Sequence, residues 1–237
     1  MEKVLEIKNI SFSYEKDKRL IENLSFSVSK SEFVSIVGSS GCGKSTIIKL
    51  ISGINRKETG EIIGKKTAYM PQKDLLLPWR TVLENIILPI ELNKKDLNEG
   101  RKKACNYLEK LNLIDYKNKY PYELSGGMKQ RVSFIRTLLT EADILLLDEP
   151  FSALDAITKE NLQKWLLDVL KNFDKSVIFI THDINEALFL SDRILICQNK
   201  PLNSLKEYII SKEDKKDLEY IGSLKEKILF DIGGGRI

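Results

Sequence analysis

Residues 33–53 have the sequence FVSIVGSSGCGKSTIIKLISG, which joins an apolar run to a glycine-rich loop and then to a second apolar run. The run at 33–38 is short and ends in glycine, which predicts a buried β-strand. Residues 45–53 predict the helix that leaves the loop. Strand, glycine-rich loop and helix, in that order, are what a phosphate-binding loop requires.

The loop at 38–46, GSSGCGKST, fits the pattern G-x-x-x-x-G-K-[ST]. Its glycines let successive backbone amides turn toward an anion, and the helix that follows points its positive end at the same place. We expect Lys44 to reach the β and γ phosphates of a nucleotide and the Ser45 hydroxyl to bind Mg²⁺. A purely structural glycine turn is the alternative, and the buried strand in front disfavours it. The expected nucleotide-binding residues of the loop are Gly38, Ser39, Ser40, Gly41, Cys42, Gly43, Lys44, Ser45 and Thr46.

Two acids follow a second buried strand in ILLLDEP, residues 144–150. In open α/β sheets, ligands sit at the carboxyl ends of the strands. We expect Asp148 to hold the magnesium, directly or through water, and Glu149 to accept a proton from an attacking water. Two acids that leave a strand into solvent are the alternative, which would be favoured if the phosphate loop were absent.

His182 is the single histidine of the chain and follows the apolar run SVIFI within THD. A lone histidine is more often a surface or satisfied core residue than a functional one. Here strand direction is expected to bring it to the same edge as Asp148. We therefore expect His182 to contact the γ phosphate.

Cys42 lies inside the phosphate loop, near a helix N-terminus, where a thiolate is favoured. We expect maleimide to inactivate the protein and ATP to protect it. The other two cysteines, Cys105 and Cys197, are far from it in sequence, and the spacing predicts neither a disulfide framework nor a zinc site. Such cysteine usage is typical of a reducing cytosol.

The composition is that of an ordinary globular protein, because 42 % of the 237 residues are apolar and 30 % are charged. A net charge of +4 without long blocks of one sign does not indicate nucleic-acid binding. The apolar runs are far shorter than the roughly 20 residues that a bilayer requires, so a membrane role is expected to go through a partner. The N-terminus has no apolar signal core, and we expect no secretion.

The order of predicted elements indicates an α/β fold with a mainly parallel sheet and helices on both faces. The first thirty residues alternate as half-buried strands do, and TAYMPQ at 67–72 predicts another strand. Apolar residues recur at helical spacing from Trp79 to Thr140, which predicts a helical insertion. The α/β pattern then resumes, with a helix at about 156–172. From about Pro201 the chain is charged, and we expect a small appendage with a frayed terminus.

The segment LSGGMKQR at 124–131, together with the phosphate loop, LLLDEP, SALD and THD, resembles the ATP-binding subunit of ABC transporters. All five segments occur in that family's order, and LSGG between the phosphate loop and DEP is its most specific feature. The resemblance implies one ABC ATPase domain over 1–237, with a P-loop NTPase (RecA-like) core. It also implies an N-terminal antiparallel β-subdomain, core and β-subdomain together taking 1–77 and 141–237, and an inserted helical subdomain at 78–140. The implied protein is an ATP-driven motor that works as a head-to-tail dimer.

The resemblance assigns further roles residue by residue. Tyr14 matches the aromatic residue that stacks on adenine, although an ordinary strand tyrosine is an equal alternative. Gln72 matches the glutamine that contacts magnesium and the attacking water. Asp155, in SALD, matches the loop that links the two sites across the dimer, and it also suits a helix N-cap. The residues that match the signature approaching the γ phosphate from the opposite subunit are Ser125, Gly126 and Gly127.

The stretch QKDLLLPWRTVLENI resembles the importer branch that serves nitrate, alkanesulfonates, taurine and pyrimidine precursors of thiamine. The resemblance implies a transmembrane permease as partner, an extracytoplasmic solute-binding protein acting through it, and a peripheral position on the cytoplasmic face of the membrane. An exposed patch here would be the permease site, whereas a core role is the alternative. The patch would contain Leu75, Leu76, Leu77 and Trp79.

Two departures and two rival functions remain. The segment between Gly53 and Gln72 is shorter than is usual in the family, which leaves the length of the β-subdomain hairpins open. The chain ends too early for the C-terminal regulatory domain of some sugar importers, so we expect no regulation of that kind.

One rival is an ABC-type ATPase of repair or translation, but no long coiled-coil insertion, zinc site or second ATPase domain is visible, and we expect no nucleic-acid partner. The other is a non-catalytic nucleotide-binding partner, which the intact Glu149 and His182 disfavour.

Overall fold

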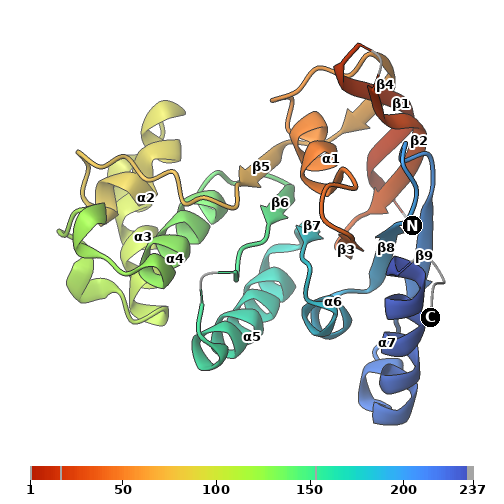
Figure 1. Cartoon of the computed structure of the whole chain (residues 1–237). Coiled ribbons are helices and arrows are strands. Elements are labelled where there is room, and N and C mark those ends of the chain that lie inside the picture. The colour runs from red at the N-terminus through yellow and green to blue at the C-terminus, as the bar shows by residue number, and fades with distance from the viewer. Residues whose placement is uncertain (1, 17, 153, 234–237) are drawn as a thin grey trace.

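The computed structural model describes residues 2–16, 18–152 and 154–233 (Figure 1). Its centre is a six-stranded sheet in the order β5-β6-β7-β3-β8-β9. The strands are parallel from β5 to β8, and β9 runs antiparallel to β8. The expected α/β class is confirmed. The bounds are β3 Phe33–Gly38, β5 Thr67–Met70, β6 Ile144–Asp148, β7 Ser176–Ile180, β8 Arg193–Cys197 and β9 Leu205–Ile209.

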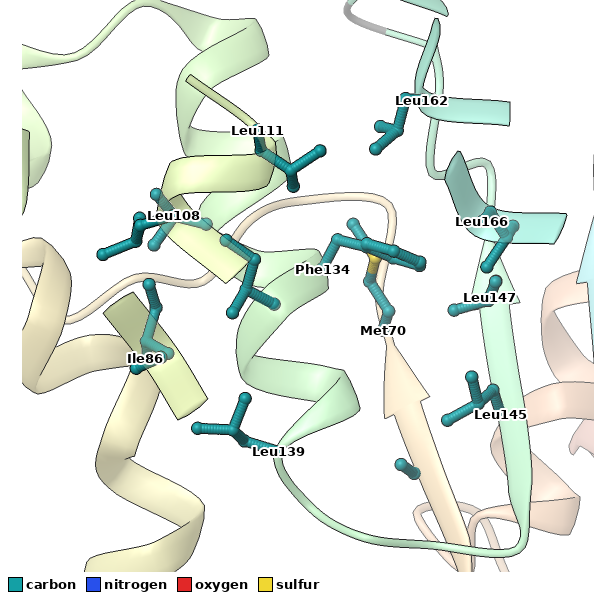
Figure 2. Packing of buried hydrophobic residues seen from close by; sticks show 14 of the residues in the cluster. Met70, Ile86, Leu108, Leu111, Phe134, Leu139, Leu145, Leu147, Leu162 and Leu166 are labelled. Atoms are coloured by element: carbon teal, nitrogen blue, oxygen red, sulfur yellow. The ribbon is translucent and has the colours of Figure 1, made fainter. Parts of the chain in front are cut away.

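The central strands β3, β6 and β7 are buried at every residue because both faces of the sheet are covered. Alternate side chains of a strand point to opposite faces. Leu145 and Leu147 of β6 therefore pack toward α5 (Ala156–Phe173), as Figure 2 shows with Leu162 and Leu166. The intervening residues of β6, Ile144 and Leu146, pack in the cluster that contains α1 (Lys44–Ile51) and the N-terminal strands.

The N-terminal strands form a separate three-stranded antiparallel sheet in the order β2-β1-β4. Their bounds are β1 Lys3–Glu15, β2 Lys18–Ser29 and β4 Thr59–Gly64. Gly60 has φ +80°, and a Cβ there would lie 2.3 Å from the carbonyl oxygens of Lys8 and Asn9, so the close approach of β4 to β1 requires glycine. The predicted antiparallel β-subdomain is confirmed, and the short segment after Gly53 still contains β4 and β5.

Three helices form a compact group at one side of the molecule (Figure 1): α2 Val82–Leu92, α3 Leu97–Lys110 and α4 Gly126–Leu138. Short 3₁₀ turns lie between α3 and α4, at Ile114–Tyr116 (η1) and Pro121–Glu123 (η2). Side-chain caps define where the helices begin, since Thr81 forms a capping box with Glu84 and Asp96 caps α3. The predicted boundaries at 78 and 140 remain a prediction, and all three helices lie between them.

The C-terminal part is not the small appendage that the sequence predicts. Strand β9 extends the central sheet, and after a 3₁₀ turn at Asp214–Lys216 (η3) comes α7, Leu218–Ile232. Leu224 and Ile228 of α7 are buried against Ile194 and Ile196 of β8. The charged residues mislead because they occupy the outer face of an amphipathic helix. The predicted frayed end from residue 234 on lies outside the described residues.

No helix in the described ranges is both long and apolar enough to cross a membrane. Helix α6, Ile184–Leu190, completes the cover of the sheet next to α7.

Candidate functional site

A pocket of about 590 Å³ lies where β3, β6 and β7 end. These strands are neighbours in a parallel arrangement, so their carboxyl ends meet at one edge of the sheet. The lining residues among those described are Tyr14, Leu20, Gly38, Ser40, Gly41, Gly43, Lys44, Ser45, Thr46, Gln72, Glu149 and His182. Most of the predicted site is thus brought together within one chain.

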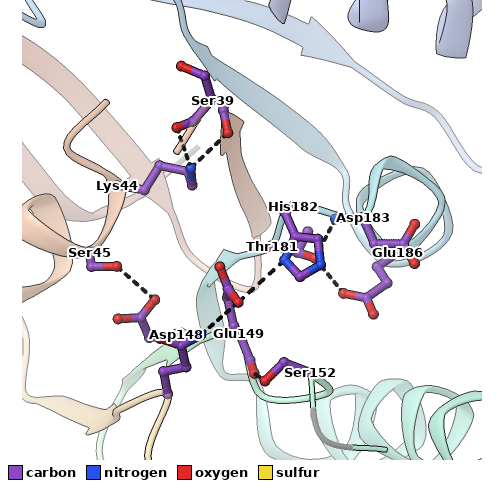
Figure 3. A network of polar contacts seen from close by, with 12 residues as sticks. Ser39, Lys44, Ser45, Asp148, Glu149, Ser152, Thr181, His182, Asp183 and Glu186 are labelled. Atoms are coloured by element: carbon purple, nitrogen blue, oxygen red, sulfur yellow. Dashed lines mark hydrogen bonds and ion pairs between the residues drawn. The ribbon is translucent and has the colours of Figure 1, made fainter. Parts of the chain in front are cut away.

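The phosphate loop connects β3 to α1 at the floor of this pocket. Gly43 has φ +108° as the N-cap of α1, a conformation that favours glycine. A Cβ on Gly38 would lie 2.7 Å from the carbonyl oxygen of Cys197, so the turn out of β3 also requires glycine. Lys44 is 8 % exposed, and its Nζ donates to the carbonyl oxygens of Gly38 at 2.7 Å and Ser39 at 2.9 Å (Figure 3). The loop thereby holds a cation beside inward-facing amides.

Cys42 and Ser39 are not among the described residues that line the pocket. The Cys42 side chain is only 2 % exposed and lies behind the loop, with Sγ 3.8 Å from Lys44 Nζ. A hydrogen bond from Cys197 lowers the pKa of Cys42, Lys44 lowers it further, and burial opposes both. Cys42 is therefore a thiol poised to ionise but sterically shielded.

Asp148, the last residue of β6, is 4 % exposed and accepts two hydrogen bonds. Ser45 Oγ donates to its Oδ1 at 3.1 Å, and Tyr69 OH donates to its Oδ2 at 3.3 Å. Burial raises the pKa of Asp148, and these two hydrogen bonds oppose the rise. Tyr69 was missed from the sequence, because its position beside Asp148 follows from the pairing of β5 with β6 and has no local signal.

The donors at Asp148 suit Mg²⁺, which prefers hard oxygen ligands and ordinarily takes one or two from protein and others from phosphates. Ser45 and Asp148 supply a hydroxyl and a carboxylate at hydrogen-bond distance from each other. The described residues contain no cluster of three or more His, Cys, Asp or Glu side chains that could hold a metal. Gln72, the third expected ligand, donates instead to Glu149.

Glu149 stands at the centre of the polar contacts that face the pocket. Its Oε2 accepts from Gln72 Nε2 at 3.0 Å and lies 3.3 Å from His182 Nδ1 (Figure 3). Its φ is +49°, which is unfavourable for a residue with a side chain and is typical of functional sites. Its backbone N–H donates to the carbonyl oxygen of Ile180, which joins the ends of β6 and β7. The structure therefore brings Gln72 and His182 into contact with Glu149, and the fourth expected catalytic residue, Lys44, lines the same pocket.

Two further side chains hold the unusual backbone of Glu149. Ser152 Oγ donates to the Glu149 carbonyl at 3.0 Å, and Gln130 Nε2 donates to the same oxygen at 3.3 Å. Gln130 is 4 % exposed and belongs to α4, so it connects the helix of the LSGG segment to the acid. Gln130 belongs to the LSGGMKQR segment, but no local sequence pattern predicted its contact with the Glu149 carbonyl oxygen.

The loop that carries His182 is attached to α5 and α6. Thr181 Oγ1 donates to Glu186 at 2.6 Å, and Lys159 Nζ pairs with Glu186 at 2.8 Å and Asp183 at 3.1 Å. His182 itself is exposed. The ion pairs thus hold the backbone of the loop while the imidazole faces the pocket.

Tyr14 is 62 % exposed at the rim of the pocket. Its ring packs edge-on against Phe12, with centroids 4.8 Å apart, and its hydroxyl lies 3.3 Å from Thr46 Oγ1. Asn55 Nδ2 donates to the same hydroxyl at 3.1 Å. One face of an oriented ring is thereby presented next to the phosphate loop.

The LSGG segment begins α4, and none of the described residues that line the pocket comes from it. Ser125 is the N-cap, and its Oγ accepts from the Met128 N–H at 3.3 Å. A Cβ placed on Gly126 would meet no atom within 4 Å. At this helix start the Met128 N–H is capped by Ser125, whereas the N–H groups of Gly126 and Gly127 form no hydrogen bond with a described residue.

Asp155 is the N-cap of α5, and its side chain accepts from the Thr158 N–H at 3.0 Å. Hydrogen bonds from Thr158 lower the pKa of Asp155. Like the LSGG segment, it is not among the described residues lining the pocket. Among the described residues, seven expected site residues are thus absent from the pocket lining: Ser39, Cys42, Ser125, Gly126, Gly127, Asp148 and Asp155. Four of them, Ser125, Gly126, Gly127 and Asp155, also lie outside the phosphate loop and the acid pair.

Comparison with known proteins agrees with this geometry. A family model described as ABC transporter matches residues 21–152. A formylaminopyrimidine import ATP-binding protein of Halalkalibacterium halodurans is 39 % identical over 230 residues, which cover 96 % of this chain and 92 % of the relative. An aliphatic sulfonates import ATP-binding protein of Bacillus cereus is 39 % identical over 229 residues, 91 % of this chain and 90 % of the relative.

A solved structure of an ATP-binding cassette, a dimer in a post-hydrolysis state bound to ADP and Pi, superposes with a TM-score of 0.78. Its sequence is 29 % identical, and the match covers 86 % of this chain and 98 % of that chain. The chain therefore belongs to the ABC transporter family and has the fold of that family's ATP-binding cassette.

Proposed function

We propose that this chain is the ATP-hydrolysing subunit of an ABC import complex and powers a separate membrane permease for a small solute. The observation that carries the proposal is the contact of Glu149 with both Gln72 and His182 at the edge of the phosphate-loop pocket. A carboxylate held beside a phosphate site is placed to accept the proton of an attacking water. Two import ATP-binding proteins among the relatives support the coupling to transport.

ATP would bind with adenine on the Tyr14 ring and its phosphates on the loop at 38–46. Lys44 would turn from the loop carbonyls toward the β and γ phosphates, exchanging neutral acceptors for charged ones. Ser45 and Asp148 would hold Mg²⁺, with Gln72 completing the contact, and the ion would neutralise charge on the phosphate oxygens. Glu149 would then take the proton from water, while His182 positions the γ phosphate.

A second copy of the chain would complete the site in a head-to-tail dimer. The free amides at Ser125, Gly126 and Gly127 form an anion-binding helix start with no partner in the described part of their own chain. They would approach the γ phosphate of the neighbouring subunit, and Asp155 would link the two sites. The dimeric ADP- and Pi-bound cassette that matches this fold supports the arrangement.

The permease would contact the surface after Gln72. Leu75 and Trp79 are 60 % and 69 % exposed, so they remain available to a partner. Leu76 is buried and Leu77 is half-buried, so only Leu75 and Trp79 of the four residues in the predicted permease patch are exposed. Arg136 donates to the carbonyl oxygens of Asp74 and Leu75 and thereby presents the segment. The permease would place the chain peripherally on the cytoplasmic face of the membrane.

The solute would be a nitrate, sulfonate, taurine or thiamine-pyrimidine type of compound, delivered to the permease by an extracytoplasmic binding protein. The relatives named for formylaminopyrimidine and aliphatic sulfonates support this range. The ATPase itself would not contact the solute.

The experiment is to reconstitute the purified chain with its partner permease in proteoliposomes and to measure phosphate release. We expect stimulation by the permease and its loaded binding protein, and none by DNA or ribosomes. Glu149→Gln in the same vesicles is the matched control for contaminating ATPases. Stimulation by DNA or ribosomes but not by the permease would favour the rival function in repair or translation.

A further inference from the structure

A second and larger pocket, of about 720 Å³, lies at the opposite end of the central sheet from the phosphate loop. Phe33 and Val177, the first or second residues of β3 and β7, form part of its wall. Strand β3 therefore begins at this pocket and ends at Gly38 in the nucleotide pocket. Its six residues span about 20 Å, which is the approximate distance between the two pockets. The two sites are distinct.

The wall of this second pocket is mainly apolar. Its lining includes Leu167 and Leu170 of α5, Leu188 of α6 and Ile221 of α7. Pockets of 300–1,000 Å³ with apolar walls and a few placed polar groups are typical of small-molecule sites. The volume and lining therefore suit an organic molecule rather than a bare ion.

The acidic side chains of the pocket have hydrogen-bond or ion-pair partners, whereas its lysines do not within the described residues. Asp174 pairs with Lys30 at 2.5 Å, and Asp192 accepts from the Phe33 N–H at 2.9 Å. By contrast, the ammonium groups of three lining lysines form no ion pair or hydrogen bond with any residue that the structure describes: Lys175, Lys212 and Lys215.

Lys215 is the most telling of the three. It is half-buried, and burial lowers its pKa while Asp192 acts in the opposite direction. Lys215 forms no ion pair with a described residue, and the longer-range charge of Asp192 is opposed by that of Lys212. A partly desolvated cation in this position costs free energy, which an anionic ligand would offset. Of the two lining acids, Asp174 pairs with Lys30, and Asp192 accepts from the Phe33 N–H and lies within the field of Lys215. Three lining lysines outnumber these two acids, so the lining favours an anion over a cation.

We propose that this pocket binds a small amphipathic organic anion, with its apolar chain between α5 and α6 and its carboxylate or sulfonate head on Lys215 and Lys212. This site goes beyond the proposed transport function, since it does not involve ATP or the permease surface. A carboxylate and a sulfonate present the same monoanionic acceptor chemistry, and the binding experiment separates them.

The test is isothermal titration of the purified chain with octanoate and with octanesulfonate, below micelle formation. Octanol and octylamine are matched neutral and cationic probes, and acetate is an anion without the chain. We expect one octanoate or octanesulfonate per chain, with the tighter of the two defining the head group, and binding at least about tenfold weaker for octanol, octylamine and acetate. Equal binding of octanol or octylamine, or no binding of either long anion, would overturn the proposal.

Variants locate the site. Lys215→Ala should weaken binding of the long anion about ten- to hundredfold, because a charge-assisted contact is lost. Lys216→Ala, at an exposed neighbour that does not line the pocket, should leave it unchanged. Leu167→Trp should block the pocket. Nucleotide affinity, measured on each variant, confirms that the protein is folded. Equal losses in Lys215→Ala and Lys216→Ala would show a diffuse surface effect and refute the site.

Discussion

Replacement of Gly126 by alanine tests whether this position must be glycine for the chain's own folding or for the approach of a phosphate bound to the partner subunit. A Cβ at Gly126 meets no atom of this chain within 4 Å, and its φ lies outside the left-handed region. Its own fold therefore tolerates alanine, which is favoured over glycine in helices by up to about 1 kcal/mol. The melting temperature should be unchanged or rise by up to about 2–4 °C for a domain of this size.

Gly222 provides the matched control. It lies within α7, and a Cβ added to it would likewise meet no atom within 4 Å. Gly222→Ala should give the same small gain in stability without affecting ATP hydrolysis, because α7 does not line the nucleotide pocket. Thermal unfolding followed by circular dichroism measures both variants.

The functional effect of Gly126→Ala should be large. A methyl group at the start of α4 would keep the backbone amides from reaching a γ phosphate on the other subunit. Loss of one charge-assisted hydrogen bond, about 1.5–3 kcal/mol, corresponds to about a ten- to hundredfold decrease in ATPase activity. Phosphate release measures that decrease, and light scattering of the variant in a Glu149→Gln background measures the loss of ATP-dependent dimers.

Two results would refute the reasoning. Wild-type ATPase activity and dimerisation in Gly126→Ala would show that no phosphate approaches this helix start. A melting temperature well below that of Gly222→Ala would show that the glycine serves its own fold instead.

Three further predictions concern the pocket itself. Glu149→Gln should slow hydrolysis by about a hundredfold or more while leaving ATP-stabilised dimers in size-exclusion chromatography, because phosphate contacts survive; near-normal turnover would exclude Glu149 as the base. The thermal stabilisation that Mg²⁺ adds in the presence of ATP should be lost in Asp148→Asn. In the wild type it should fade at a higher pH than for an ordinary aspartate, since burial raises this pKa and the carboxylate protonates as the pH falls through it; an unchanged Mg²⁺ effect in the variant would contradict the ligand assignment. Maleimide should label Cys42 slowly, because it is 2 % exposed, and ATP should protect it. In a Cys105→Ser background the rate should rise less than the roughly tenfold per pH unit of an ordinary thiol near neutral pH, because the pKa of Cys42 is lowered. Labelling indifferent to ATP would show that nucleotide bound on the loop does not shield this thiol.

Local patterns explain what could be predicted. The phosphate loop depends on glycines whose backbone conformations are set within a few residues, and it lies where its pattern placed it. The helix at about 156–172 is α5, and SVIFI is β7, because periodicity and length are properties of one segment. The prediction of a small appendage in the charged C-terminal part was wrong. A short edge strand and an amphipathic helix have few apolar residues, and their role becomes clear only when those residues pack against the central sheet.

The sequence by itself determined which chemical groups the protein carries and in what order: a phosphate loop, an acid pair, a histidine and a glycine-rich helix start. Tertiary structure alone decided that Tyr69 contacts Asp148, that Gln130 holds the backbone of Glu149, and that Leu76 is buried beside an exposed Leu75. It also brought together the apolar side chains and three lysines that line the second pocket. The physical reason is that strand order, register and burial arise from packing between segments distant in the chain, whereas glycine turns and strand ends are specified locally.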